Sequence, residues 1–220
     1  MFWKWSTSGH HEDRRSERQR RVRMRLEHDA AIQQIDGFLS WVGNKEEQIA
    51  VLDYAIKVVK RDLIGEGLSQ IVYGKEVPEW RLDLPGPARG AEKETISVDL
   101  AKTDVLVTPW DATRLSRAIR NLRRGPFDQT EDSYTATYYS DIELLVIGNG
   151  IHHTAVASVG QGGILDGCRV VRWTPLFEEI STDGAVWNYL KDGSILPVSD
   201  FRLALLYTLA KMKHELQSAP

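Results

Sequence analysis

Residues 143–157 read Glu-Leu-Leu-Val-Ile-Gly-Asn-Gly-Ile-His-His-Thr-Ala-Val-Ala, and this stretch decides the fold. Its apolar first part is typical of a buried strand, and Gly-Asn-Gly is typical of a turn. A helical pattern begins directly after the second glycine. The stretch therefore predicts a strand–turn–helix junction, which places the chain in the α/β (α+β) class.

The junction has two possible roles. Glycines allow a ligand to approach the backbone closely, and the N–H groups at a helix start favour an anion. The first role is therefore a phosphate site, and the second is a plain connection with two partly exposed histidines. For the first role, the predicted nucleotide-binding residues are Gly148, Gly150, His152, His153, Thr154 and Arg114.

Upstream of the junction, residues 108–111 read Thr-Pro-Trp-Asp and predict a helix start with Thr108 as N-cap. Arginines follow at spacings of three, three and four, at Arg114, Arg117, Arg120 and Arg124. This basic stripe faces either a phosphate or solvent. Asp111 is a candidate catalytic residue beside the two histidines.

The β-rich runs at 96–107, 135–147 and 164–173 predict one small mixed sheet, with the helices near Asp111 and Ile151 packed on it. Asp141 and Glu143 flank its central strand and are expected on one face, since strand side chains alternate. They either hold Mg²⁺ beside a phosphate, with Glu143 catalytic, or lie on the surface. Residues 175–190 predict a short helix, broken near Asp183, and residues 201–216 a final amphipathic helix.

The N-terminal part has helical periodicity, and residues 18–64 predict a helical hairpin outside the sheet. Seven arginines lie between Arg14 and Arg25, opposed only by Glu17. Such a segment either contacts phosphate backbones or is a solvated helix start. The predicted DNA-binding residues are Arg14, Arg15, Arg18, Arg20, Arg21, Arg23, Arg117 and Arg120.

Composition sets the outer limits. The net charge of −3 excludes a polycation, and the lone Cys168 excludes a disulfide framework or a cysteine-based zinc site. No apolar run reaches membrane-spanning length, so we expect a cytoplasmic protein with no membrane partner. A Pro- and Gly-rich linker at 74–95 predicts a division into a helical extension, 1–73, and an α/β domain, 96–220.

The order of strand, capped helix, strand, Gly-x-Gly turn and helix resembles the ParB/sulfiredoxin superfamily. Residues 150–153, Gly-Ile-His-His, look like its Gly-x-His-Arg signature, and residues 108–119 resemble the segment before it. The resemblance covers roughly residues 95–175. Ile151 stands where sulfiredoxins have their nucleophilic cysteine, which argues against sulfinic acid reduction. His153 replaces an arginine, which should weaken phosphate binding and make it pH-sensitive.

The resemblance implies a nucleotide-binding protein that takes ATP, or another nucleoside triphosphate, with Mg²⁺. It further implies an ATPase with possible DNase activity, acting on DNA or on conjugative DNA transfer as in plasmid fertility inhibition. Under this hypothesis the catalytic residues are His152, His153, Glu143 and Asp111. The alternative is a non-catalytic module that binds DNA or protein and has a degenerate nucleotide pocket. The nucleotide, the metal and the oligomeric state stay open.

Overall fold

A computed structural model describes residues 9–74, 84–86, 94–123, 125, 127, 129, 133–160 and 162–219, with side chains in the first helix from residue 16 onward. The helices and strands follow one another in the order α1 (Gly9–Ser40), α2 (Lys45–Ser69), β1 (Thr95–Asp99), β2 (Asp104–Leu106), α3 (Ala112–Leu122), β3 (Thr135–Tyr139), β4 (Leu144–Asn149), α4 (Ile151–Val159), β5 (Ile164–Val171), a 3-10 turn (Thr174–Leu176), β6 (Ile180–Thr182), β7 (Val186–Tyr189), β8 (Ile195–Pro197) and α5 (Phe201–Ser218).

The main sheet is five-stranded and mixed, in the order β1-β5-β3-β4-β2. The β1–β5 and β3–β4 pairs are antiparallel, whereas β5–β3 and β4–β2 are parallel. All three predicted β-rich runs therefore join one sheet, and the expected hairpin at 135–147 is present. The predicted α+β class is confirmed.

Strand β4 is buried on both faces, because its side chains alternate between two hydrophobic clusters. Leu144 and Val146 belong to the cluster that faces α1, α2 and α5. Leu145 and Ile147 belong to the cluster that faces α4. This is why the strand reads as a continuous apolar run rather than as an alternating one.

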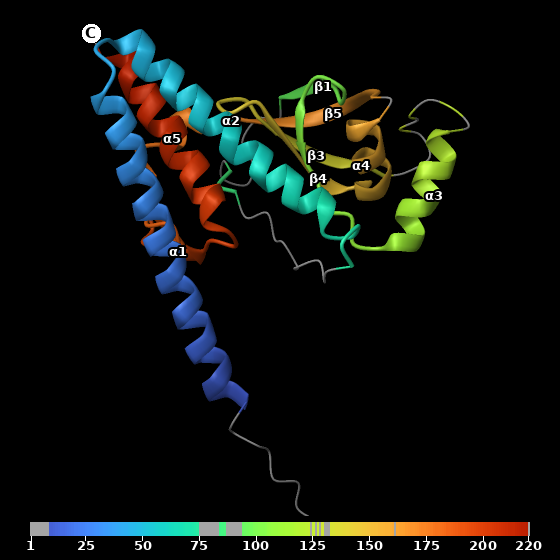
Figure 1. Cartoon of the computed structure of the whole chain (residues 1–220), viewed down its shortest axis with the longest axis horizontal. Helices are drawn as coiled ribbons and strands as arrows, with labels where there is room; N and C mark the ends of the chain where they lie inside the picture. Colours follow the sequence, from blue (N-terminus) through green and yellow to red (C-terminus); the bar gives the residue numbers. More distant parts are fainter. Residues whose placement is uncertain are drawn as a thin grey trace, which may run out of the picture.

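Three long helices, α1, α2 and α5, cover one side of the sheet, and α5 lies between the other two (Figure 1). The predicted hairpin is present, and Asn44 caps α2 by accepting a hydrogen bond from the N–H of Glu47 at 2.8 Å. On the other side α4 packs against the sheet, and α3 packs against α4 at the edge of the molecule (Figure 1). Helix α3 shares the hydrophobic cluster of the sheet through its last residue, Leu122, but packs mainly on α4.

Hydrophobic packing crosses the linker at 74–95, most of which lies outside the described residues. Met24 and Leu52 from the N-terminal helices share a cluster with Leu144 of the sheet and Leu205 of α5. The expected division of the chain at this linker therefore does not separate two cores. No helix in the described ranges has the length and apolarity needed to cross a bilayer.

The helix predicted for residues 175–190 is wrong. After the 3-10 turn the chain forms an antiparallel hairpin of β6 and β7, in which Thr182 pairs with Trp187. The connection is an Asp-Gly turn, where Gly184 has a φ of +85° and Asp183 Oδ1 accepts from the N–H of Ala185 at 3.0 Å. Asp-Gly between strand-forming residues is a strong hairpin signal, and it outweighs the weak helical periodicity here.

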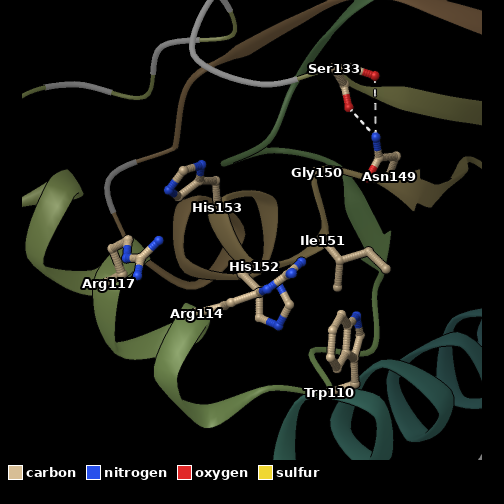
Figure 2. Close-up of a pocket in the computed structure, with 9 residues that line it drawn as sticks. All are labelled: Trp110, Arg114, Arg117, Ser133, Asn149, Gly150, Ile151, His152 and His153. Atoms are coloured by element: carbon tan, nitrogen blue, oxygen red, sulfur yellow. Dashed lines mark hydrogen bonds between the residues drawn. The ribbon is translucent and has the colours of Figure 1, made fainter.

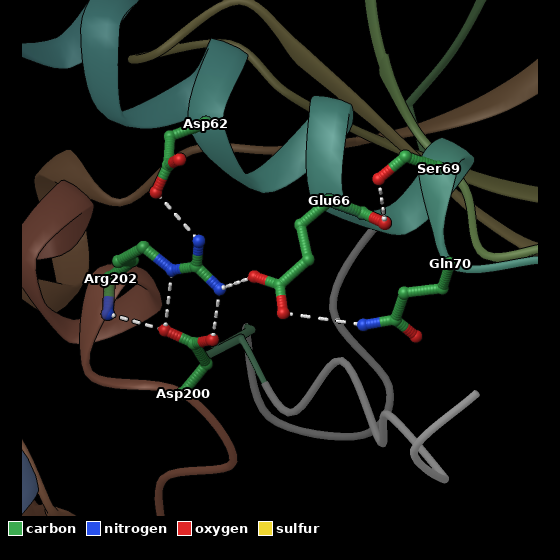
Figure 3. A network of polar contacts seen from close by, with 6 residues as sticks. All are labelled: Asp62, Glu66, Ser69, Gln70, Asp200 and Arg202. Atoms are coloured by element: carbon green, nitrogen blue, oxygen red, sulfur yellow. Dashed lines mark hydrogen bonds and ion pairs between the residues drawn. The ribbon is translucent and has the colours of Figure 1, made fainter. Parts of the chain in front are cut away.

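One arginine joins α5 to α2. Arg202 donates to Asp200 at 2.6 Å, to Asp62 at 2.6 Å and to Glu66 (Figure 3). Only 13% of its side chain is exposed. Burial opposes the charge of Arg202, but hydrogen bonds and attraction from these carboxylates outweigh it and raise the pKa of the guanidinium. Arg202 is therefore a permanent positive charge that fixes the start of α5.

Candidate functional site

The predicted strand–turn–helix junction is present. β4 ends at Asn149, and Gly150 is the N-cap of α4 with a left-handed φ of +79°. A Cβ atom on Gly150 would lie 2.1 Å from the ring of Tyr134, so an aromatic side chain fills that space. The glycine is therefore required by its backbone angle and by Tyr134, and not by the approach of a ligand.

A pocket opens at this junction. It lies between the first turn of α4, the loop before α3 and the side of α3 that carries Arg114 and Arg117 (Figure 2). Its cavity volume is about 360 Å³. Nine residues line it: Trp110, Arg114, Arg117, Ser133, Asn149, Gly150, Ile151, His152 and His153. The pocket therefore brings together residues that the sequence separates by up to 43 positions, from Trp110 to His153.

The pocket lining is cationic. Arg114 and Arg117 project from α3 toward the first turn of α4, where His153 lies (Figure 2). Among the described residues, no acidic side chain lines the cavity. The start of α4 adds the partial positive charge of its helix dipole. The arrangement is suited to an anion that can accept hydrogen bonds from several directions.

Asp111 and His152 hold the two walls of the pocket together. Asp111 is the N-cap of α3, and its carboxylate accepts from the N–H of Arg114 at 2.9 Å. That hydrogen bond, above all, lowers the pKa of Asp111 and keeps it ionised. The N–H of Asp111 donates to Nε2 of His152 at 3.2 Å. His152 therefore uses its lone pair to join α4 to α3, which is a positioning role.

Helix α3 begins three residues later than the sequence predicted, because Asp111 rather than Thr108 is its N-cap. Trp110 consequently lies in the loop before the helix, with 54% of its surface exposed. The guanidinium carbon of Arg114 is 4.9 Å from the centroid of the indole ring, and the ring of His152 is 5.5 Å away. The tryptophan is thus held at the pocket mouth by two cationic or polar neighbours.

Four predicted site residues do not line the pocket. Thr154 is fully buried and donates to the carbonyl of Gly150 at 2.9 Å, so it braces the turn. A Cβ on Gly148 would lie 2.7 Å from Oγ1 of Thr135, which shows that Gly148 serves strand pairing. Asp111 lies beside the pocket in the capping role above. Glu143 precedes β4, whereas Gly150 follows it, so Glu143 lies at the opposite end of the strand.

The carboxylate pair expected for Mg²⁺ is not formed on a strand. Asp141 and Glu143 lie in the turn between β3 and β4, and Glu143 has a φ of +51°. Asp141 accepts from the N–H of Trp173 at 2.7 Å and from the hydroxyl of Thr174 at 2.7 Å. Within the described part of the chain, no three His, Cys, Asp or Glu residues cluster to hold a metal ion. The pocket lining does not fit Mg²⁺, which prefers carboxylate ligands.

Sequence reasoning missed Trp110, Ser133 and Asn149 as lining residues. Asn149 donates from Nδ2 to the carbonyl of Ser133 at 2.6 Å and to its hydroxyl at 3.2 Å (Figure 2). Asn149 was readable as part of the Gly-Asn-Gly turn. Ser133 reaches the site only through the pairing of β3 with β4, for which the local sequence gives no signal.

The predicted DNA-binding arginines fall into two groups. Those of α1 and those of α3 lie at opposite ends of the molecule (Figure 1). The side chains of Arg14 and Arg15 lie outside the described residues, as does Arg124. The structure therefore does not bring the two groups onto one surface.

Comparison with known proteins gives one match. No curated protein and no solved structure matches the chain significantly. The resemblance to the ParB/sulfiredoxin superfamily accordingly stays a prediction. A family model covers residues 8–219, nearly the whole chain, and the protein therefore belongs to this family, which is described as a family of unknown function (DUF6710).

Proposed function

We propose that the protein binds the phosphate groups of a nucleotide in the pocket between α3 and α4. One observation carries the proposal: Arg114, Arg117 and His153 meet at the start of α4, in a cavity whose described lining has no acidic side chain. Charge-assisted hydrogen bonds from arginine are the strongest contacts that a protein offers to phosphate.

Binding without hydrolysis is the better supported form of this proposal. Phosphoryl transfer depends on stabilising charge and on positioning a nucleophile, usually with a metal ion. Asp111 already caps α3, and Glu143 lies at the far end of β4. ATPase and DNase activity therefore stay predictions, for which the described pocket lining offers no carboxylate to hold Mg²⁺ or to act as a base.

Calorimetric titration of the full chain with pyrophosphate, ATP and adenosine tests the proposal. We expect pyrophosphate and ATP to bind and adenosine to bind far more weakly, because the phosphates supply the contacts. Arg117→Ala should cost about 1.5–3 kcal/mol of binding free energy, the usual range for a hydrogen bond to a charged group. Arg18→Ala, an exposed arginine on α1, is the matched control and should change nothing.

A second variant tests whether the side chain at position 153 contacts the phosphate. His153→Arg places a permanent cation at this position of the pocket and should preserve or strengthen ATP binding. Gly150→Val is unsuitable as a test, because it would collide with Tyr134 and strain the backbone. The proposal fails if neither pyrophosphate nor ATP binds to the folded wild-type protein.

A further inference from the structure

The cationic surface of the pocket continues beyond the pocket along α3. Arg114 and Arg117 line the cavity, and Arg120 follows three residues later. Arg117 and Arg120 are exposed and have no ion-pair partner within the described part of the chain. From Arg114 to Arg120 the helix axis advances by about 9 Å, at 1.5 Å per residue. A row of this length is longer than one phosphate group needs.

An exposed aromatic ring lies beside this row. Trp110 is 54% exposed at the pocket mouth and contacts Arg114. Basic grooves with exposed aromatic rings are typical of proteins that bind single-stranded nucleic acid, because unpaired bases stack on the rings while cations contact the phosphates. A duplex keeps its bases stacked on each other, so it would leave Trp110 unused.

The pocket itself favours a strand end. A terminal phosphate monoester carries nearly two negative charges at pH 7, whereas an internal phosphodiester carries one. Arg114 and Arg117 together with the start of α4 supply more positive charge than one diester requires.

We propose that the ligand of this pocket is the phosphorylated end of a single-stranded nucleic acid. The terminal phosphate lies between α3 and α4, the following phosphates run along α3 toward Arg120, and a base near the end stacks on Trp110. This proposal rests on the proposed function, because it assigns a substrate class to the same phosphate site.

Fluorescence anisotropy with oligonucleotides of about ten residues tests it, a length within the usual range for single-strand binding sites. The probes carry a terminal phosphate at the 5′ end, at the 3′ end or at neither end. We expect one phosphorylated probe to bind at least 10-fold more tightly than the unphosphorylated probe. A blunt duplex with the same terminal phosphate should bind more weakly than that single strand.

Variants at three positions locate the binding surface. Trp110→Ala should weaken oligonucleotide binding about 5- to 100-fold, and Trp110→Phe should restore most of it. Arg120→Ala should weaken oligonucleotide binding and reduce its logarithmic salt slope by about 0.7. Arg120→Ala should not alter pyrophosphate binding by calorimetry, because Arg120 lies outside the pocket lining. Arg117→Ala should weaken the binding of both ligands.

The outcomes distinguish the two proposals. If pyrophosphate binds but the terminal phosphate gives no preference, or the duplex binds as well as the single strand, the strand-end proposal is overturned and the nucleotide site stands. The strand-end proposal is also overturned if neither Trp110→Ala nor Arg120→Ala changes the affinity for the oligonucleotide. If pyrophosphate does not bind at all, the phosphate site is wrong, and the strand-end proposal is overturned with it.

Discussion

Two helices of this protein are rich in arginine, yet they offer very different surfaces. On α1, Arg20 and Arg21 both pair with Glu17, at 3.1 and 3.0 Å. Arg25 pairs with Asp183 of the β6–β7 turn at 2.6 Å. These three of the seven arginines in this segment thus have a carboxylate partner within the fold.

On α3 the opposite holds. Arg117 and Arg120 have no ion-pair partner among the described residues, and Arg114 lies 4.0 Å from the carboxylate of Asp111 at closest. The shorter row of arginines therefore keeps its charge available to a ligand, and two of its members line a pocket. The comparison teaches that the number of arginines in a segment is a poor guide to binding, because nearby carboxylates decide how much charge remains.

The largest expected effect is the reversal of one charge on each helix. Arg117→Glu places a carboxylate in the phosphate pocket, where like charges repel, and should weaken pyrophosphate binding at least 30-fold, or about 2 kcal/mol. Arg18→Glu makes the same change at an exposed position of α1 and should leave the affinity for pyrophosphate within two-fold of wild type. Calorimetry on both variants measures the difference. Equal losses would show that the two helices attract the ligand only through net charge.

A paired arginine should affect stability and not binding. Arg202→Met leaves Asp200, Asp62 and Glu66 close together without their cation. Because Asp62 and Glu66 are partly exposed, we expect a loss of about 2 kcal/mol in the free energy of unfolding, below the range for fully buried pairs. Urea denaturation measures this loss. Pyrophosphate affinity should stay the same, and a parallel loss of affinity would mean that α5 is coupled to the pocket.

The smallest effect is the release of paired arginines on α1. Glu17→Gln removes the ion pairs of Arg20 and Arg21 and should cost about 0.5 kcal/mol of stability at pH 7, as exposed helix pairs do. It should also steepen the salt dependence of nonspecific DNA binding, because two more arginines become available. Titration of a labelled oligonucleotide at several salt concentrations measures the slope. Glu46→Gln, at an exposed position of α2, is the control for the salt dependence.

The ion pairs of Glu17 with Arg20 and Arg21 also predict that the stability of the fold falls at acid pH. Hydrogen bonds from Arg20 and then Arg21 lower the pKa of Glu17. Its stabilising contribution is therefore complete above the unfolded pKa of about 4.3 and is lost as the pH falls through the folded pKa. Thermal melts of wild type below pH 5 should approach those of Glu17→Gln. A constant gap between the two down to pH 2 would contradict the assignment.

The parts of the fold that the sequence predicted correctly are those with strong local signals. The apolar run at 144–147 and Gly150 located the junction, because a doubly buried strand and a left-handed turn leave few alternatives. The hairpin of α1 and α2 followed from helical periodicity and the cap at Asn44. At 180–189 the Asp-Gly turn was interpreted as a break in a helix, whereas it connects the two strands of the β6–β7 hairpin.

The candidate site was only half predictable. Positions 150, 152 and 153 were correctly grouped, since they adjoin one another in sequence. The roles of Thr154 and Glu143 were not, because helix phase turns Thr154 into the core and β4 separates Glu143 from the junction by its whole length. Both Thr108 and Asp111 are good N-cap residues. Because Asp111 is the cap, Trp110 lies in the loop before α3, where it lines the pocket.

The position of α5 in the chain has a consequence for folding during synthesis. α5 comes after every other described element, yet it lies between α1 and α2 and fills their shared core with Leu203, Leu206 and Leu209. Until it emerges from the ribosome, Leu52 and Leu63 of α2 lack their main packing partner. The nascent protein therefore exposes an apolar hairpin until α5 has been synthesised, so its burden on chaperones should exceed what the native surface suggests.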